Sequence, residues 1–367
     1  MSEPLNLSEL RQKLADEGTP WAMTESNPVL DLSEEDRQNL LGVELPPGVS
    51  IEELEQEVPA AVTAVQAEAD SISAPARFDH RNVNGRDFTT PVRDQGGCGT
   101  CVSHGTAAVM ETTWQRANNR PDSGINLSEA HLHYCHGGKT CSQGWWPDEA
   151  MAKVKQHRLA AEDKFPYGSA TTCQVASGWQ STSSSFASSS IVRGRAAMKE
   201  WIATKGSLTC CFVVYQDFFS YQSGVYRHVS GGVAGGHCVE IIGYDDSLAA
   251  WLCKNSWGTG WGDDGLFWIG YGQCRIENYA DPKGMPHGVT GVDVRRWVDS
   301  RVSALWTNTS QRNAYAYLSS NGWMKVNNDS GNASHHAMTL ELVGAKQANR
   351  NVRARVEGNE IKELYVT

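Results

Sequence analysis

The stretch that decides the fold is Gln95-Gly96-Gly97-Cys98-Gly99-Thr100-Cys101, which leads directly into a run with helical periodicity. From Val102 to Thr113 the less polar positions recur at spacings of three, four and seven residues, as on one face of a helix. The glycines stop just before Cys101, so the sequence places this thiol where a loop becomes a helix N-terminus. The unpaired N–H groups and the helix dipole favour a thiolate there, which is the nucleophilic form.

A base and an orienting amide for this nucleophile follow downstream. His237 comes after two glycines and opens an apolar run, and Asn255 ends a second apolar run. His237 lies 136 residues after Cys101, and Asn255 lies 154 residues after it. In papain and the cathepsins, His and Asn follow the nucleophile by roughly 130–150 residues. The chain therefore resembles the papain-like cysteine proteases.

Further motifs of that family occur in the family's order over roughly 200 residues, from about Ala74 to Asp281. They are Pro91-Val92-Arg93-Asp94-Gln95, Leu127-Ser128-Glu129, Phe165-Pro166-Tyr167 and Lys254-Asn255-Ser256-Trp257-Gly258-Thr259-Gly260-Trp261-Gly262, of which the last is the most specific. Predicted helices dominate residues 76–180 and predicted strands dominate 207–281. This order indicates an α+β fold with a helical lobe, a β lobe and a catalytic cleft between them, in a peptidase domain at 76–285.

The resemblance implies a role for each residue of the site. Cys101 would attack the scissile carbonyl, His237 would act as general base and Asn255 would orient the imidazole. Gln95 would supply the side-chain half of the oxyanion hole, opposite the backbone N–H of Cys101. Trp257 would shield the hydrogen bond between His237 and Asn255 from water.

The substrate groove is expected on both sides of this centre. Gly144 would pair its backbone with an extended substrate, and apolar or aromatic side chains would enter a pocket between two walls. The wall residues are Trp145, Trp146, Gly235 and Gly236. Glu277 could reach the pocket floor. The departures from the family pattern, Thr100, Val102 and Gln143, leave the mechanism unchanged and affect specificity.

The sequence also allows other interpretations of its function besides a peptidase. Cys98 and Cys101 also form a C-x-x-C, as in thiol redox proteins and zinc sites, although no second such pair exists. A peptide ligase or amidase could use the same acyl-thioester, and a non-catalytic peptide-binding protein could retain the fold. His131, His133 and His136 resemble a loose zinc site but are expected to be surface histidines. We expect neither a metal nor an organic cofactor.

The ten cysteines are many for a reducing cytosol and favour an exported or otherwise oxidising location, although Met1–Asn6 shows no secretory signal. The resemblance implies the disulfides Cys98–Cys141 and Cys135–Cys173. The usual partner of Cys274 is absent, and Cys210 or Cys211 could replace it. No run of 18 apolar residues occurs, so a membrane-spanning helix is not expected.

Charge separates the N-terminal residues from the rest of the chain. Residues 1–75 carry 16 Asp/Glu and three Lys/Arg, a net charge of −13, whereas the remainder carries 26 and 29, a net charge of +3. The segment is expected to contain short helices and is interpreted either as a flexible acidic leader or as an inhibitory prosegment attracted electrostatically to the cleft. The partners expected are thus a polypeptide substrate and the chain's own N-terminus. The sequence has no basic stripe that would indicate nucleic acid.

Residues 290–367 match nothing in the protease core. Two hairpins are predicted across Asn321-Gly322 and Gly358-Asn359, with a helix over 335–348 between them. These elements indicate a small α+β module, in which the aromatic side chains either pack in a core or bind a ligand. The run Ser181–Ser190 is predicted to be either a linker or an irregular edge strand.

Overall fold

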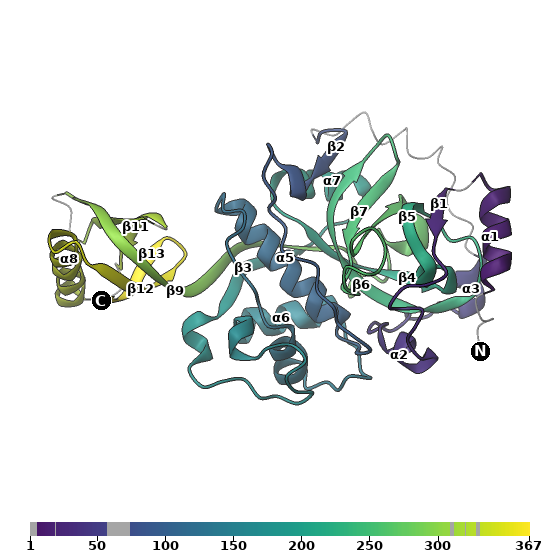
Figure 1. Ribbon diagram of the computed structural model, residues 1–367, viewed down its shortest axis with the longest axis horizontal. Coiled ribbons are helices and arrows are strands. Elements are labelled where there is room, and N and C mark those ends of the chain that lie inside the picture. The colour runs from purple at the N-terminus through teal and green to yellow at the C-terminus, as the bar shows by residue number, and fades with distance from the viewer. Residues whose placement is uncertain (1–5, 19, 57–73, 309–311, 320, 328–330) are drawn as a thin grey trace. The chain divides into compact units, whose positions relative to one another are not determined.

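The computed structural model describes residues 6–18, 20–56, 74–308, 312–319, 321–327 and 331–367 (Figure 1). The chain divides into two compact units. One consists of Met1–Val175 and Phe186–Val292, and the other of Ala176–Ser185 and Asp293–Thr367. The described part of the acidic segment therefore belongs to the same unit as the predicted peptidase lobes.

The helical lobe is built around α5, which covers Cys101–Ala117 and is buried over most of its length. α6 (Pro147–His157) packs against it and begins with proline at its first position and two acidic residues in its first turn. The predicted helix over Leu127–His133 is displaced, because its regular part is a π-helical turn at His131–His136. The short 3-10 turns of the unit are His80–Asn82, Glu162–Lys164, Gln216–Ser220 and Gln273–Arg275.

The β lobe is an open sheet in the order β1-β5-β8-β7-β6-β4, and β2 also pairs with β6. The strands are β1 (Trp21–Met23), β2 (Arg77–Asp79), β4 (Leu208–Tyr215), β5 (Tyr221–Tyr226), β6 (Val233–Asp245), β7 (Ala250–Lys254) and β8 (Leu266–Gly270). Every residue of β4 and β7 is buried, and both strands are predominantly apolar. The helix α7 (Arg195–Thr204) packs on β4 and β6. The sequence does not predict β5, because Gln222, Ser223 and Gly224 interrupt the apolar pattern of the strand.

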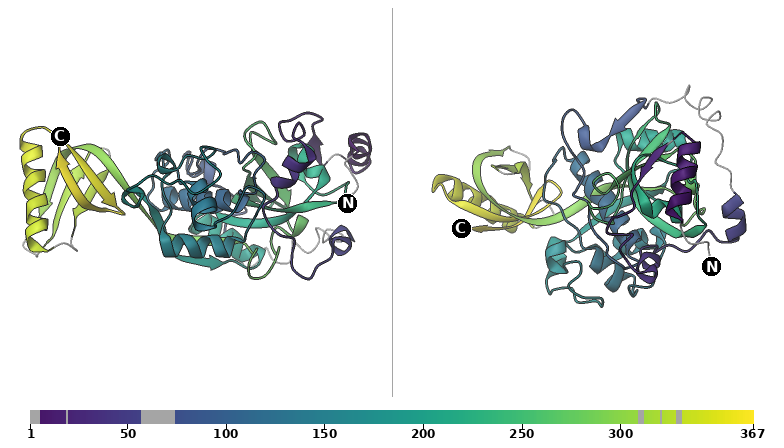
Figure 2. Two further views of the ribbon diagram at one scale, coloured as in Figure 1. Left: turned by 90° about the horizontal axis from the view of Figure 1, so that it is seen from below. Right: turned by 45° about the vertical axis from the view of Figure 1, so that its right-hand side comes forward.

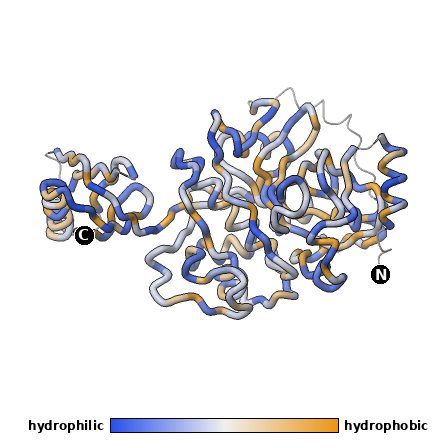
Figure 3. The backbone as a smooth tube through the Cα atoms, in the orientation of Figure 1, coloured by the Kyte–Doolittle hydropathy of each residue, from blue (hydrophilic) through white to orange (hydrophobic). Residues whose placement is uncertain are grey.

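The N-terminal segment contributes to the core of this unit. It forms α1 (Leu7–Asp16), α2 (Glu34–Asn39) and α3 (Ile51–Gln56), with Asn6 and Ser33 as hydrogen-bonding N-caps of the first two. In Figure 3 helix α1 alternates hydrophilic and hydrophobic residues, and its Leu10 and Leu14 are buried in the β-lobe core together with Trp21. The segment from 6 to 56 is therefore a packed element of the unit.

The second unit contains a closed barrel whose strands follow one another in the sequence. Its elements are β9 (His287–Thr307), which begins in the first unit, β10 (Ala314–Leu318), β11 (Gly322–Val326), α8 (Asn332–Gln347), β12 (Asn351–Glu357) and β13 (Glu360–Val366) (Figure 2). Both predicted hairpins and the predicted helix are present. The serine-rich run forms β3 (Ser184–Ile191), which pairs with β9 and follows the 3-10 turn Trp179–Thr182.

Two further sequence expectations can be compared with the structure. The disulfides Cys98–Cys141 and Cys135–Cys173 are present as expected. Cys210 and Cys211 are buried thiols outside any disulfide, so neither replaces the missing partner of Cys274. Over the described residues, no helix has both the length and the apolar character needed to cross a membrane.

Candidate active site

Cys101 is the first residue of α5 and is completely buried. The loop before it is held by the Cys98–Cys141 disulfide and by a 2.6 Å hydrogen bond from the Gly99 N–H to the Cys141 carbonyl. Gly96 has φ +57°, a left-handed conformation that glycine adopts without strain. The loop therefore fixes the position at which the helix starts.

His237 and Asn255 come together from neighbouring strands of the β lobe. The imidazole Nε2 of His237, on β6, lies 2.8 Å from Oδ1 of Asn255, which directly follows β7. Oδ1 also accepts a hydrogen bond from the Ser256 N–H, so the Asn255 amide is oriented and Nε2 must donate. This leaves Nδ1 of His237 as the basic nitrogen, a buried atom without a hydrogen-bond partner.

Trp257 covers this pair, as the sequence predicted. Its ring centroid lies 4.7 Å from that of His237, and the side chain is only 2% exposed. Phe218 and Phe219 pack against Trp257 on the side of the β lobe. The hydrogen bond between His237 and Asn255 is therefore shielded from water.

Gln95 is anchored on both sides of its amide. Its Oε1 accepts a 2.6 Å hydrogen bond from the Ser256 hydroxyl, and its Nε2 donates to the Cys98 carbonyl at 2.7 Å. The Tyr167 hydroxyl donates to the Gln95 carbonyl and lies 2.7 Å from the Thr100 hydroxyl. The sequence identifies Ser256 and Tyr167 only as members of motifs, and the structure shows that both hold Gln95.

The second donor site of Gln95 faces the N-terminal segment. Nε2 donates at 3.0 Å to the carbonyl oxygen of Leu40, which follows α2. Gly42 then accepts from the Trp145 N–H at 3.1 Å, and Val43 donates to the Gly236 carbonyl at 3.2 Å. Residues 40–43, which follow the end of α2, therefore pass through the site and form backbone hydrogen bonds with both of its sides.

The predicted groove residues surround residues 41–43. A Cβ on Gly144 would lie 1.9 Å from the Gly42 oxygen, and a Cβ on Gly235 would lie 2.9 Å from Leu41. On Gly236 it would lie 2.7 Å from the Val43 oxygen. Only glycine allows so close an approach at these three positions.

The expected pocket walls are partly in place. Trp145 and Trp146 are buried, and Trp146 packs against Tyr279 at a centroid distance of 6.3 Å. Glu277 does not line the pocket as suggested. Its carboxylate is held by Arg195 at 2.9 Å and by the Trp251 indole N–H at 3.0 Å, inside the β lobe.

Burial shifts the pKa values of both reacting groups in the closed site. Burial raises the pKa of the Cys101 thiol. Hydrogen bonds with the backbone of Cys238 and Gly42 lower this pKa, but by less than burial raises it. The pKa of His237 is lowered to about 4, because the effect of burial exceeds the opposite effect of the hydrogen bond with Asn255. With residues 40–43 in the cleft neither group is solvated, and burial favours the neutral form of each.

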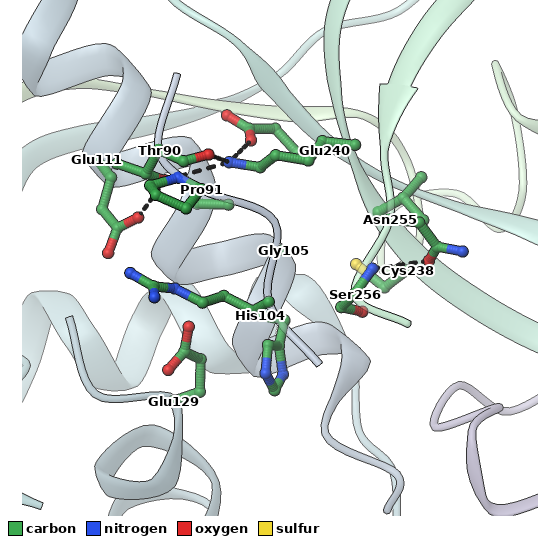
Figure 4. A pocket seen from close by; sticks show the side chains of 14 residues that line it. Thr90, Pro91, His104, Gly105, Glu111, Glu129, Cys238, Glu240, Asn255 and Ser256 are labelled. Atoms are coloured by element: carbon green, nitrogen blue, oxygen red, sulfur yellow. Dashed lines mark hydrogen bonds and ion pairs between the residues drawn. The ribbon is translucent and has the colours of Figure 1, made fainter. Parts of the chain in front are cut away.

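A charged cluster beside the site supports the end of β7, directly before Asn255. A small cavity of about 20 Å³ is lined by Glu111, Glu129, Glu240 and the neighbouring Asn255 and Ser256, and Figure 4 shows these side chains. The adjacent residue Lys254 forms a 2.8 Å ion pair with Glu240 and hydrogen bonds with Thr90. These contacts fix the end of β7.

Of the three histidines that resemble a zinc site, His131 and His133 are buried and His136 is partly buried, which corrects the expectation of a surface location. Nδ1 of His131 accepts from the Ala160 N–H at 3.1 Å, and Nε2 of His133 lies 2.9 Å from the Thr140 carbonyl. Nε2 of His136 lies 2.6 Å from the Arg158 carbonyl, so all three rings serve packing. In the described part of the chain no group of three or more His, Cys, Asp or Glu side chains is placed to hold a metal.

A helical lobe and a β lobe that bring a cysteine, a histidine and an asparagine to their junction define the architecture of a thiol peptidase. The family model for papain family cysteine proteases matches residues 74–282. The chain therefore belongs to the papain family of cysteine proteases and is a papain-type cysteine peptidase.

Individual relatives agree with this assignment. The cathepsin B-like CP2 of Giardia intestinalis is 33% identical over 228 residues, which cover 58% of this chain and 74% of that protein. The thiol protease aleurain of Arabidopsis thaliana is 31% identical over 205 residues, covering 53% and 56% of the two chains.

Solved structures share the papain-like fold. ProCathepsin B S9 from Trypanosoma congolense superposes with a TM-score of 0.61 at 21% identity, covering 78% of this chain and 99% of that one. The digestive procathepsin L2 proteinase from Tenebrio molitor larval midgut gives a TM-score of 0.56 at 24% identity, covering 77% and 88%. The predicted α+β class and its two lobes are thereby confirmed.

Proposed function

We propose that this chain is a self-inhibited precursor, in which Cys101, His237, Asn255 and Gln95 hydrolyse peptide bonds once the N-terminal segment has left the cleft. The observation that carries the proposal is the hydrogen bond from the Gln95 amide to the Leu40 carbonyl. A chain carbonyl of the segment occupies the donor that would otherwise stabilise the oxyanion of a substrate.

The catalytic cycle follows from the orientation of the side chains. Nδ1 of His237 takes the proton from the Cys101 thiol, and the sulfur attacks the scissile carbonyl carbon. Gln95 and the Cys101 N–H donate hydrogen bonds to the oxyanion, and each such donor is typically worth ~2.7–4 kcal/mol. The imidazolium then protonates the leaving amine, and water hydrolyses the acyl-thioester. Asn255 keeps the proton on Nε2 throughout and so preserves the reactive tautomer.

Inhibition rests on backbone pairing and apolar burial. Residues 38–43 form hydrogen bonds with Ala234, Gly236, Trp145 and Gln95, and the Leu40 and Val43 side chains are at most 5% exposed. Among the described residues 6–56, the ion pairs are Arg11–Glu25 and Lys13–Glu9, both internal to the segment. The described residues of the segment therefore form no direct ion pairs with the peptidase lobes that would correspond to the expected electrostatic attraction.

The same contacts indicate the substrate preference. Val43 pairs its backbone with Gly236 and buries its side chain in a cluster that includes Trp145, Trp146 and Tyr279. An apolar or aromatic side chain of a polypeptide substrate would occupy this place, since the pocket offers no opposite charge once Glu277 is bound to Arg195.

The test uses a chain that begins at Ala74, with fluorogenic peptides as substrates. Cys101→Ala and His237→Ala should each remove nearly all activity, whereas Cys210→Ala, a buried thiol in the β-lobe core, should retain it. Near-UV circular dichroism checks that each variant is folded. More than a few per cent of residual activity in Cys101→Ala would contradict the assignment of the nucleophile.

A further inference from the structure

The C-terminal barrel has a specific connectivity. β9 pairs with β10 and with β12, β10 pairs with β11, and β12 pairs with β13, all antiparallel. β11 pairs with β13 in parallel and closes the circle, and α8 lies between β11 and β12 in sequence. Numbered within the module, the strand order is 1-2-3-5-4-1 with a helix after the third strand. This is the connectivity of the five-stranded OB barrel, whose ligands bind on the face of strands 2 and 3.

The corresponding face of this barrel carries a group of aromatic rings. Side chains alternate along β10 and β11, so the buried Ala316, Leu318 and Met324 fill the barrel while their neighbours point outward. The outward rings are Trp306 on β9, Tyr315 and Tyr317 on β10, and Trp323 on β11. Cross-strand register pairs them as Tyr315 with Trp306 and Tyr317 with Trp323.

These rings are available to a ligand. Trp306 is 47% exposed, Trp323 is 46% exposed and Tyr317 is 38% exposed. The described residues include seven exposed large hydrophobic side chains, and these rings are three of them. The ring centroids are 5.5 Å apart in each pair, with interplanar angles of 64° and 83°, so the rings support one another edge to face. A cluster of this kind indicates a binding surface, whereas single exposed rings are ordinary.

The charges of the face favour an uncharged ligand. Between the rings, the outward positions of β10 and β11 carry a single charged residue, Lys325, and no carboxylate. The unit has ten Lys/Arg and seven Asp/Glu over residues 293–367, and several bases are already paired with acids. These pairs are Arg295–Glu357, Arg355–Glu363 and Lys362–Glu360. A polyanion needs several unpaired cations along its path, and this face does not provide them.

We infer that the face formed by Trp306, Tyr315, Tyr317 and Trp323 binds an uncharged oligosaccharide. Sugars with all-equatorial substituents, as in β-1,4-linked glucose or N-acetylglucosamine, present apolar C–H surfaces that stack on aromatic rings. Their hydroxyl groups would bond with the two phenols and with the Lys325 side chain, which alternation along β11 places on the same side as Trp323.

The test uses the full chain with Cys101→Ala, so that no autolysis occurs and peptidase activity is not the readout. Cellohexaose and chitohexaose are titrated while tryptophan fluorescence and heat are measured. We expect saturable binding that is weakened about tenfold by Trp323→Ala and by Trp306→Ala, because each removes one stacking ring. Tyr365→Ala, an exposed ring on β13 outside this face, is the matched control and should bind as before.

Two results would overturn the inference. One is the absence of binding to both sugars and to every other uncharged oligosaccharide on a glycan array. The other is binding of a single-stranded oligonucleotide that weakens steeply with salt and depends on the same rings, which would assign the face to a polyanion. The side chains of Trp306, Trp323 and Tyr365 are exposed, and thermal melting curves confirm that each variant is folded. Neither result bears on Cys101, so the proposed peptidase mechanism is tested separately.

Discussion

Gly42→Ala should open the precursor without touching the catalytic residues. A Cβ at position 42 would lie 2.2 Å from the carbonyl oxygen and 2.6 Å from the carbonyl carbon of Gly99, where ordinary contacts begin at 3.4 Å. The obstacle is the backbone of the loop before Cys101, which the Cys98–Cys141 disulfide holds in place. The segment must therefore move by more than 1 Å.

The cost of this displacement follows from the contacts that it strains. The hydrogen bonds from Trp145 to Gly42 and from Gln95 to Leu40 are 3.1 and 3.0 Å long, and each is worth ~0.5–1.5 kcal/mol net. Overpacking adds ~1–3 kcal/mol. A total of about 3 kcal/mol corresponds to roughly a 100-fold increase in the open population.

The assay is the rate at which an epoxide inhibitor labels Cys101 in the full chain at pH 7, read by mass spectrometry before autolysis begins. We expect labelling about 100-fold faster in Gly42→Ala than in the wild type. Gly48→Ala is the control, because its Cβ meets nothing within 4 Å and adds only the strain of φ +76°. Equal labelling rates in Gly42→Ala and the wild type would refute the view that residues 40–43 block the site.

Three further predictions concern the same site. The pKa of His237 is about 4 in the closed state, whereas a solvated histidine has a pKa of ~6.5. Because only the open state takes up the proton in this range, the free energy of opening should fall by ~2 kcal/mol between pH 7.5 and 5. The labelling rate of the full chain, measured with a pH-insensitive alkylating agent, should therefore rise over this range, and a rate independent of pH would contradict the prediction. Asn255→Ala should lose less activity than His237→Ala, because Asn255 orients the base and takes part in no bond change; equal losses in kcat would disagree. Peptide-library profiling should show apolar or aromatic residues at the second position before the scissile bond, and a dominant preference for Arg or Lys there would contradict the placement of Glu277.

The parts of the fold that the sequence predicts are those with strong local signals. β4 is a continuous buried run at Leu208–Tyr215, and α7 matches the predicted bounds at Arg195–Thr204. β5 has no comparable pattern, because its residues pair with β8 and β1 only through tertiary contacts. The connectivity of the C-terminal barrel likewise depends on β9, which pairs with both β10 and β12 and has no local signal for doing so.

For the site, sequence motifs identify the residues but not their state. Cys101, His237, Asn255 and Gln95 were all predicted from the motifs, and the contacts of Gln95 and Asn255 follow the expected pattern. Docking of the N-terminal segment with apolar contacts by Leu40, Leu41 and Val43 is expected from the sequence, whereas the hydrogen bonds of the Leu40 and Gly42 carbonyls in the site are not. The neutral thiol and imidazole depend on burial by residues 40–43 and therefore on tertiary structure alone.

The central claim is that an intact Cys101 site is closed by the chain's own N-terminus. The most direct measurement is active-site titration with an epoxide inhibitor at pH 7 and low salt, comparing the full chain with a chain that begins at Ala74. The shorter chain should bind one equivalent at Cys101 at once, and the full chain should bind almost none on the same timescale. Equal, rapid and stoichiometric labelling of both chains would contradict the claim.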